Sequence, residues 1–331
     1  MPQPSYPFAS ARVKSRENSI MNHDKALRLA GAESPKEAMR ILAELGYGDA
    51  EETEPEQFEK CLSAELDQAY DFVEEITPDQ KVTNLFFLQY DYHNLKAILK
   101  GELKGTGAAQ QILLNKGNLE PTAMYEAVRE KRYGDFPPEM AQALEELDRR
   151  FAVKEDPSLI GLTLDRAYAA QVSRELQDVK ESFVREFFSL TFDFANLTAF
   201  LRLRRINAGR DLLEKAYLSG GSIPAALFQK AFETTVDDGF SMLIRGPQQR
   251  ELAAAYDYYK STGSFAMFHK AKADSLMKLA SANRQDLFSI APVLAYLVGK
   301  LREVETIRMI LLSKLNGIEN KELLDLLPAL L

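Results

Sequence analysis

An apolar helical stripe with an acid at its centre occurs three times in this chain, at intervals of about 100 residues. The clearest copy is LFFLQYDYHNLKAILKG, from Leu85 to Gly101, with Asp91 in the middle. Apolar residues spaced three and four apart predict a helix with one buried face. An acid within such a face needs partners, because burying an unpaired charge is costly. This recurrence constrains the fold more than any single motif does.

The second copy is found by placing Asp193 over Asp91, which also brings Asn196 onto Asn94. It aligns FFSLTFDFANLTAFLR with LFFLQYDYHNLKAILK. A third, looser copy has Glu303 in place of the aspartates, in LVGKLREVETIRMILLSKLNG. The aligned stripes are Leu85, Leu88, Tyr92, Leu95, Leu99; Phe187, Leu190, Phe194, Leu197, Leu201; and Leu297, Lys300, Val304, Ile307, Leu311.

Each acid is followed, fourteen residues later, by Gly105, Asn207 or Gly317. Glycine and asparagine best tolerate the left-handed backbone that ends many helices. We therefore expect the three acid-bearing helices to end at these positions. Helix starts are predicted at Ser34 and Thr77, each of which precedes a proline.

The repeats predict an all-α chain of three similar helical domains that arose by internal triplication. LDQAYDF at 66–72 and LDRAYAA at 164–170 precede the first two acid-bearing helices, and turns at Gly117 and Gly221 follow them. Good helix formers dominate the rest of the chain. Turn signals predict domains at 1–116, 117–220 and 221–331.

The recurrence of an acid at aligned positions favours a structural role over catalysis. We expect each acid to orient neighbouring helices through a buried hydrogen bond or ion pair. Lys96 and Arg308 follow their acids by five residues, about a turn and a half, so the partners of the acids are expected on other helices. The structural repeat positions are Asp91, Asn94, Asp193, Asn196, Glu303 and Arg308.

The sequence lacks the motifs of common catalytic, cofactor and metal sites. No P-loop pattern occurs, and GTGAAQ at 105–110 lacks the third glycine of a dinucleotide fingerprint. His23, His93 and His269 are far apart and have no HExxH or cysteine partners. We therefore predict no catalytic residue, no cofactor and no metal ion.

Charge and composition exclude further classes of protein. A net charge of −8 argues against nucleic-acid binding. The single cysteine, Cys61, fits a reducing compartment, and the N-terminus lacks the apolar core of a signal peptide. The longest apolar runs are far shorter than the roughly 20 residues of a membrane span. We expect a cytoplasmic protein that does not cross a membrane.

Two basic clusters stand out against the acidic background. Cations at a helix end offset its dipole, but four arginines in nine residues exceed that need. The alternative is contact with an acidic protein partner. The candidate contact residues are Arg202, Arg204, Arg205 and Arg210 in RLRRINAGR, and Arg12, Lys14 and Arg16 in ARVKSRE.

The motifs DYHNLKAILKG, KLREVETIRMILLSKLNG and ARVKSRE resemble the C subunit of the bacterial and archaeal A/V-type rotary ATPases, whose eukaryotic counterpart is the d subunit. The resemblance covers nearly the whole chain, although the middle copy is looser. It implies a funnel-shaped protein with three domains in a pseudo-threefold arrangement. It also implies a peripheral, non-catalytic part of the central stalk on the cytoplasmic face of the proteolipid (c/K) ring. Such a protein is a socket for the D and F shaft and couples ATP hydrolysis or synthesis to ion transport.

Two other hypotheses remain open from the residues alone. One is a helical-repeat scaffold for soluble protein partners. The other is an enzyme that uses Asp91, His93 and Glu303. The rotor hypothesis predicts that Asp91→Asn is tolerated in assembly assays if packing survives.

Overall fold

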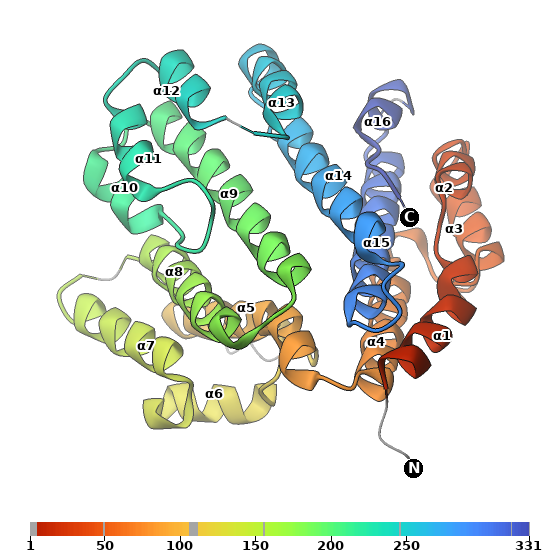
Figure 1. Ribbon diagram of the computed structural model, residues 1–331, viewed down its shortest axis with the longest axis horizontal. Coiled ribbons are helices and arrows are strands. Elements are labelled where there is room, and N and C mark those ends of the chain that lie inside the picture. Colours follow the sequence, from red (N-terminus) through yellow and green to blue (C-terminus); the bar gives the residue numbers. More distant parts are fainter. Residues whose placement is uncertain are drawn as a thin grey trace. The chain divides into compact units, whose positions relative to one another are not determined.

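The computed structural model describes residues 5–48, 50–105, 112–154, 156–244, 246–318 and 320–330. Over these ranges all regular secondary structure is helical, with sixteen α-helices, several short 3₁₀ helices and no strand (Figure 1). The all-α prediction is confirmed. Most of the GTGAAQ segment lies outside the described residues.

The helices form two compact units. Unit 1 combines both ends of the chain, Met1–Gln80 and Gln248–Leu331, whereas unit 2 is the continuous segment Lys81–Pro247. Each unit is described by itself below. The three domains expected from the turn signals remain a prediction.

Unit 1 is built around one long helix, α15 (Ala291–Leu315), which is buried on all sides over residues 291–300. The helix packs against α14 and α4 and also contacts the N-terminal helices α1, α2 and α3. Figure 1 shows these first and last helices, in red and blue, side by side. The other helices of unit 1 are α1 (Tyr6–Arg16), α2 (His23–Ala30), α3 (Pro35–Glu44), α4 (Glu59–Ile76), α13 (Gln249–Thr262), α14 (Ala266–Asn283) and α16 (Asn320–Leu326).

Unit 2 holds the other two acid-bearing helices, α5 (Gln80–Lys104) and α9 (Ser182–Arg205). Aromatic side chains join them, and the ring centroids of Phe86 and Phe187 are 4.9 Å apart. The remaining helices are α6 (Pro121–Arg129), α7 (Pro138–Phe151), α8 (Ser158–Glu175), α10 (Arg210–Ala216), α11 (Ala225–Phe232) and α12 (Val236–Leu243).

The predicted helix ends are confirmed in all three acid-bearing helices. Gly105, Asn207 and Gly317 have φ angles of 62°, 50° and 66°, and each lies one or two residues beyond its helix. Ser34 caps α3, as predicted, by accepting a hydrogen bond from the backbone N–H of Glu37.

The predicted helix start at Thr77 is wrong. Thr77 has an extended backbone and ends α4, and the next helix, α5, begins only at Gln80. The residue before a proline is pushed towards extended conformations, which accounts for the end of α4 at this point.

Candidate functional site

The three aligned acids are buried carboxylates in long helices. Asp91 of α5 is 0% exposed, Asp193 of α9 is 7% exposed and Glu303 of α15 is 1% exposed. Asp91 and Asp193 lie in unit 2, whereas Glu303 lies in unit 1. A buried carboxylate must find hydrogen-bond donors, and each of the three finds them in a different segment.

Asp91 binds the loop that leads into α6. Its carboxylate accepts hydrogen bonds from the backbone N–H groups of Asn118 and Leu119, each at 3.0 Å, and from the Asn118 side chain at 3.1 Å. The loop comes so close that a Cβ atom added at Gly117 would lie 2.0 Å from Asp91 Oδ1. Glycine is therefore required by space at this position.

Asp193 binds the loop that leads into α11 in the same way. Its carboxylate accepts from the backbone N–H groups of Ser222 and Ile223, each at 3.0 Å, and from the Ser222 hydroxyl. A Cβ atom added at Gly221 would lie 2.3 Å from Asp193 Oδ1. The two aspartates thus hold their loops by the same pattern of donors.

The aligned asparagines fix the same loops at a second point. Asn94 exchanges two hydrogen bonds of 2.9 Å with the backbone N–H and C=O of Leu114. Asn196 does the same with Leu218, at 2.8 Å for both bonds. A side-chain amide pairs with a peptide group in this way because it has one acceptor and one donor in matching positions.

Glu303 binds donors from three places in unit 1. It accepts from the backbone N–H of Met21 at 3.0 Å, from the Tyr47 hydroxyl at 2.7 Å and from Lys300 Nζ at 3.2 Å. Lys300 is itself 3% exposed and also donates to Glu65. The third acid is therefore the centre of a buried ionic network.

Burial and local charges shift several pKa values in these sites. Burial raises the pKa of Asp91, although the N–H donors of Leu119 and Asn118 oppose this. Burial and the nearby Glu303 carboxylate raise the pKa of Tyr47. For Lys300, burial lowers the pKa, but Glu303 and Glu65 outweigh it and the net shift is upwards. The lysine therefore carries its charge inside unit 1.

The neighbouring cations pair with acids on other helices. Lys96 forms an ion pair with Asp165 of α8, and Arg308 forms two hydrogen bonds with Glu59 of α4, at 2.6 and 2.9 Å. Each cation follows its acid by five residues, about a turn and a half, so the two side chains do not face each other on the same helix. The acids themselves accept hydrogen bonds from loop residues, and Glu303 also accepts one from Lys300 of its own helix, whereas the sequence had led us to expect partners on other helices.

The four arginines near the end of α9 interact within the chain. Arg204 donates to the carbonyl oxygens of Phe232, the last residue of α11, and of Thr234, at 2.6 and 2.8 Å. Arg210 pairs with Glu233. Arg202 and Arg205 are exposed, and both also interact with neighbouring groups.

The N-terminal cations also contact nearby side chains. Arg12 forms an ion pair with Glu75 at 3.3 Å, and Lys14 pairs with Glu17 at 2.6 Å. Arg16 stacks on a ring of α4, with its guanidinium carbon 3.8 Å from the centroid. These contacts give the three cations a role within unit 1.

One hollow of the described surface lies apart from the three acids. A hollow of about 350 Å³ in unit 2 is lined by residues of α7, α8 and α10, and by none of the three acids. His93 is exposed beside the buried Asp91. In the described part of the chain, no three His, Cys, Asp or Glu side chains are grouped so as to hold a metal ion. No helix there combines the length and apolar character needed to cross a membrane.

Sequence reasoning missed the donors of all three acids. The glycines at 117 and 221 were visible as aligned turns, and that alignment was the available signal for a contact with the aspartates. Met21 and Tyr47 carried no such signal, because they lie far from Glu303 in sequence.

Together, the fold and these sites define an all-α scaffold in which buried carboxylates bind the backbone of loops. The chain belongs to the ATP synthase (C/AC39) subunit family, whose sequence profile matches residues 9–326. The resemblance seen in the three motifs is thereby confirmed.

Individual relatives are similar in sequence to this chain over most of their length. The C subunit of the A-type ATP synthase of Methanocaldococcus jannaschii is 24% identical, over 98% of this chain and 86% of the relative. That of Methanothermobacter thermautotrophicus is 26% identical, over 93% and 84%. The C subunit of the V-type sodium ATPase of Enterococcus hirae is 20% identical, over 80% of both chains.

Proposed function

We propose that this chain is a non-catalytic central-stalk subunit of an A/V-type rotary ATPase. The observation that carries the proposal is the family match over residues 9–326. The relatives are named as parts of an A-type ATP synthase and of a V-type sodium ATPase, and these names support the same kind of complex. In this role the chain couples ATP hydrolysis or synthesis to ion transport.

The proposed partners are the proteolipid ring of the membrane sector and the D and F subunits of the shaft. The chain caps the cytoplasmic face of the ring as a peripheral protein and is a socket for the shaft. A part that transmits torque must be stiff. The buried acids support this role, because each fixes a loop to a long helix through several hydrogen bonds.

We further propose that the fold arose by triplication, with three domains near 1–116, 117–220 and 221–331 in a pseudo-threefold, funnel-shaped arrangement. Support comes from the matching donors around Asp91 and Asp193. The left-handed residues that follow the three acid-bearing helices support it as well.

A coupling assay tests the proposed function. Membrane vesicles from a host strain that lacks this chain are compared with vesicles to which the purified chain has been restored. The proposal predicts that ATP-driven ion uptake is lost without the chain and returns with it, while the catalytic head still hydrolyses ATP. Uptake that is unaffected by removal of the chain would reject the rotor role and leave a scaffold for other partners.

A further inference from the structure

The loops held by the two aspartates have one feature in common. Each aspartate accepts the backbone N–H of the residue two positions before a helix, Leu119 before α6 and Ile223 before α11, at 3.0 Å. Glu303 accepts the N–H of Met21, which lies two positions before α2, also at 3.0 Å. The three contacts are therefore equivalent in position and length.

The origin of the bound segment differs. The aspartates bind loops that follow 28 and 30 residues later along the chain. Glu303 binds a residue 282 positions earlier. The segment that docks on α15 thus comes from the opposite end of the chain.

We propose that α15 carries a docking site for the N-terminal segment of the chain (residues 5–48), and that Glu303 is the residue that holds this segment in place. We call residues 5–48 the clasp. It completes unit 1 without being continuous with α15, and it is held there only by non-covalent contacts and by the single connection to α4.

Further contacts attach the clasp to α15 and to the turn that precedes it. The Tyr47 hydroxyl donates to Glu303 at 2.7 Å, Lys314 donates to the carbonyl of Ala32 at 2.6 Å, and the Ser10 hydroxyl donates to the carbonyl of Leu287 at 3.2 Å. Buried apolar side chains of α2 and α3 add packing. These are Ala26, Leu29, Ala30, Ala38, Met39, Ile41 and Leu42.

The use of glutamate fits the docking of a separate segment. At the aspartates, the residue two positions before the N–H donor is Gly117 or Gly221, and the loop backbone touches the carboxylate. The residue two positions before Met21 is Ser19, which has a side chain. Glutamate has one more methylene group than aspartate, and the two oxygens of Glu303 are divided between the N–H of Met21 and the hydroxyl of Tyr47.

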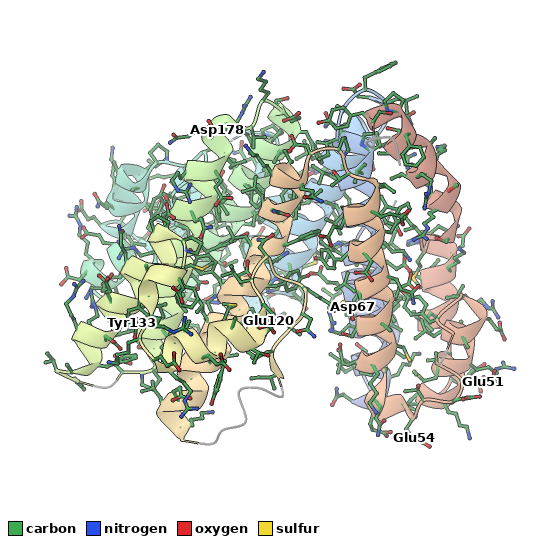
Figure 2. All side chains as sticks on the ribbon, turned by 90° about the horizontal axis from the view of Figure 1, so that it is seen from below. Glu51, Glu54, Asp67, Glu120, Tyr133 and Asp178 are labelled. Atoms are coloured by element: carbon green, nitrogen blue, oxygen red, sulfur yellow. The ribbon has the colours of Figure 1, made fainter. Side chains whose placement is uncertain are left out.

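The connection between the clasp and α4 is accessible. Glu51, Glu52 and Glu54 lie in the loop that joins α3 to α4 and are exposed, and Figure 2 shows Glu51 and Glu54 at this edge of unit 1. A cut in this loop would leave the N-terminal segment attached by its docking contacts alone.

A protease-cleavable full-length chain tests the proposal. A protease recognition sequence is inserted between Glu51 and Glu54, the folded protein is cut, and retention of the N-terminal fragment is followed by size-exclusion chromatography and native mass spectrometry. We expect the fragment to stay bound. Glu303→Gln should release it about 10- to 100-fold faster, the factor expected for a buried charge-assisted hydrogen bond.

Two further variants keep the test decisive. Tyr47→Phe removes one donor without leaving a buried charge unpaired, and it should also accelerate release. This variant carries the test if Glu303→Gln does not fold. Asp193→Asn disturbs the equivalent contact in unit 2 and should leave release unchanged. Immediate loss of the fragment from the cut parent, or equal release from the parent, Glu303→Gln and Tyr47→Phe, would overturn the proposal. The assay uses the isolated chain, so its outcome is independent of the proposed function.

Discussion

At the scale of single residues, the donors around Asp91 decide which substitutions the chain tolerates. All its partners, the two backbone N–H groups and the Asn118 side chain, donate hydrogen bonds. Asp91→Asn would turn one acceptor oxygen into an NH₂ group that faces donors. The rotor hypothesis predicts tolerance of this change in assembly if packing survives, and that stays a prediction. We expect a loss of about 1–3 kcal/mol in unfolding free energy, measured by urea titration. Unchanged stability would contradict the assigned contacts.

Gly117 gives a second prediction at this scale. Gly117→Ala places a Cβ atom 2.0 Å from Asp91 Oδ1 and should cost about 1–3 kcal/mol, because the carboxylate or the loop must move. Gly161→Ala is the matched control, since Gly161 lies in α8 with nothing within 4 Å of the added atom. The control should gain about 0.5–1 kcal/mol from helix propensity. Thermal melts of both variants make the comparison, and equal effects would argue against the close approach of loop and acid.

Tyr47 gives a prediction for alkaline pH. Burial and Glu303 raise its pKa above the ordinary value of 10.0, so the folded state keeps a proton that the unfolded state releases. The stabilisation is complete below about pH 10 and is lost as the pH rises further. Tyr47→Phe should therefore show a shallower loss of unfolding free energy between about pH 10 and pH 11 than the parent. Parallel pH profiles would mean that Tyr47 titrates normally.

The residue types predicted the acids but could not predict their partners. The stripe and its acid repeat in the sequence, so Asp91, Asp193 and Glu303 were found by alignment. Their donors are mostly backbone N–H groups, which every residue except proline possesses. The residue type therefore does not mark these backbone donors, and Met21 additionally lies at the other end of the chain.

At the scale of helices, the left-handed residue after α9 is a test of how these elements end. Asn207 has a φ of 50° and is exposed, so its backbone conformation can be examined without disturbing the core. Asn207→Val should cost about 1–2 kcal/mol, because a β-branched residue is strained in this region. Asn207→Gly should keep or slightly raise stability. Thermal melts that show the reverse order would contradict the helix-end assignment.

Helices were the most predictable elements because their signals are local. The spacing of apolar residues indicates a helix, and a glycine or asparagine beyond it indicates where the helix ends. Thr77 shows the limit of this reasoning. The same Thr-Pro pair can start a helix or end the previous one, and here it ends α4, three residues before α5 begins.

At the scale of the whole molecule, helices that pack together are not always consecutive in the sequence. Unit 1 joins residues from both termini, whereas unit 2 is continuous. Turn signals divide a sequence only into consecutive segments, so they could not predict a unit made of two separate segments. The family resemblance was accessible from the sequence because it rests on motifs that extend through the chain.

We propose that this chain is part of a rotary ATPase and joins the proteolipid ring to the shaft. The most direct measurement is affinity purification of the tagged chain from detergent-solubilised membranes of its host, with identification of the proteins that accompany it. The account predicts recovery of both the proteolipid and the D and F subunits. Recovery of a monomeric chain with neither of them would contradict it.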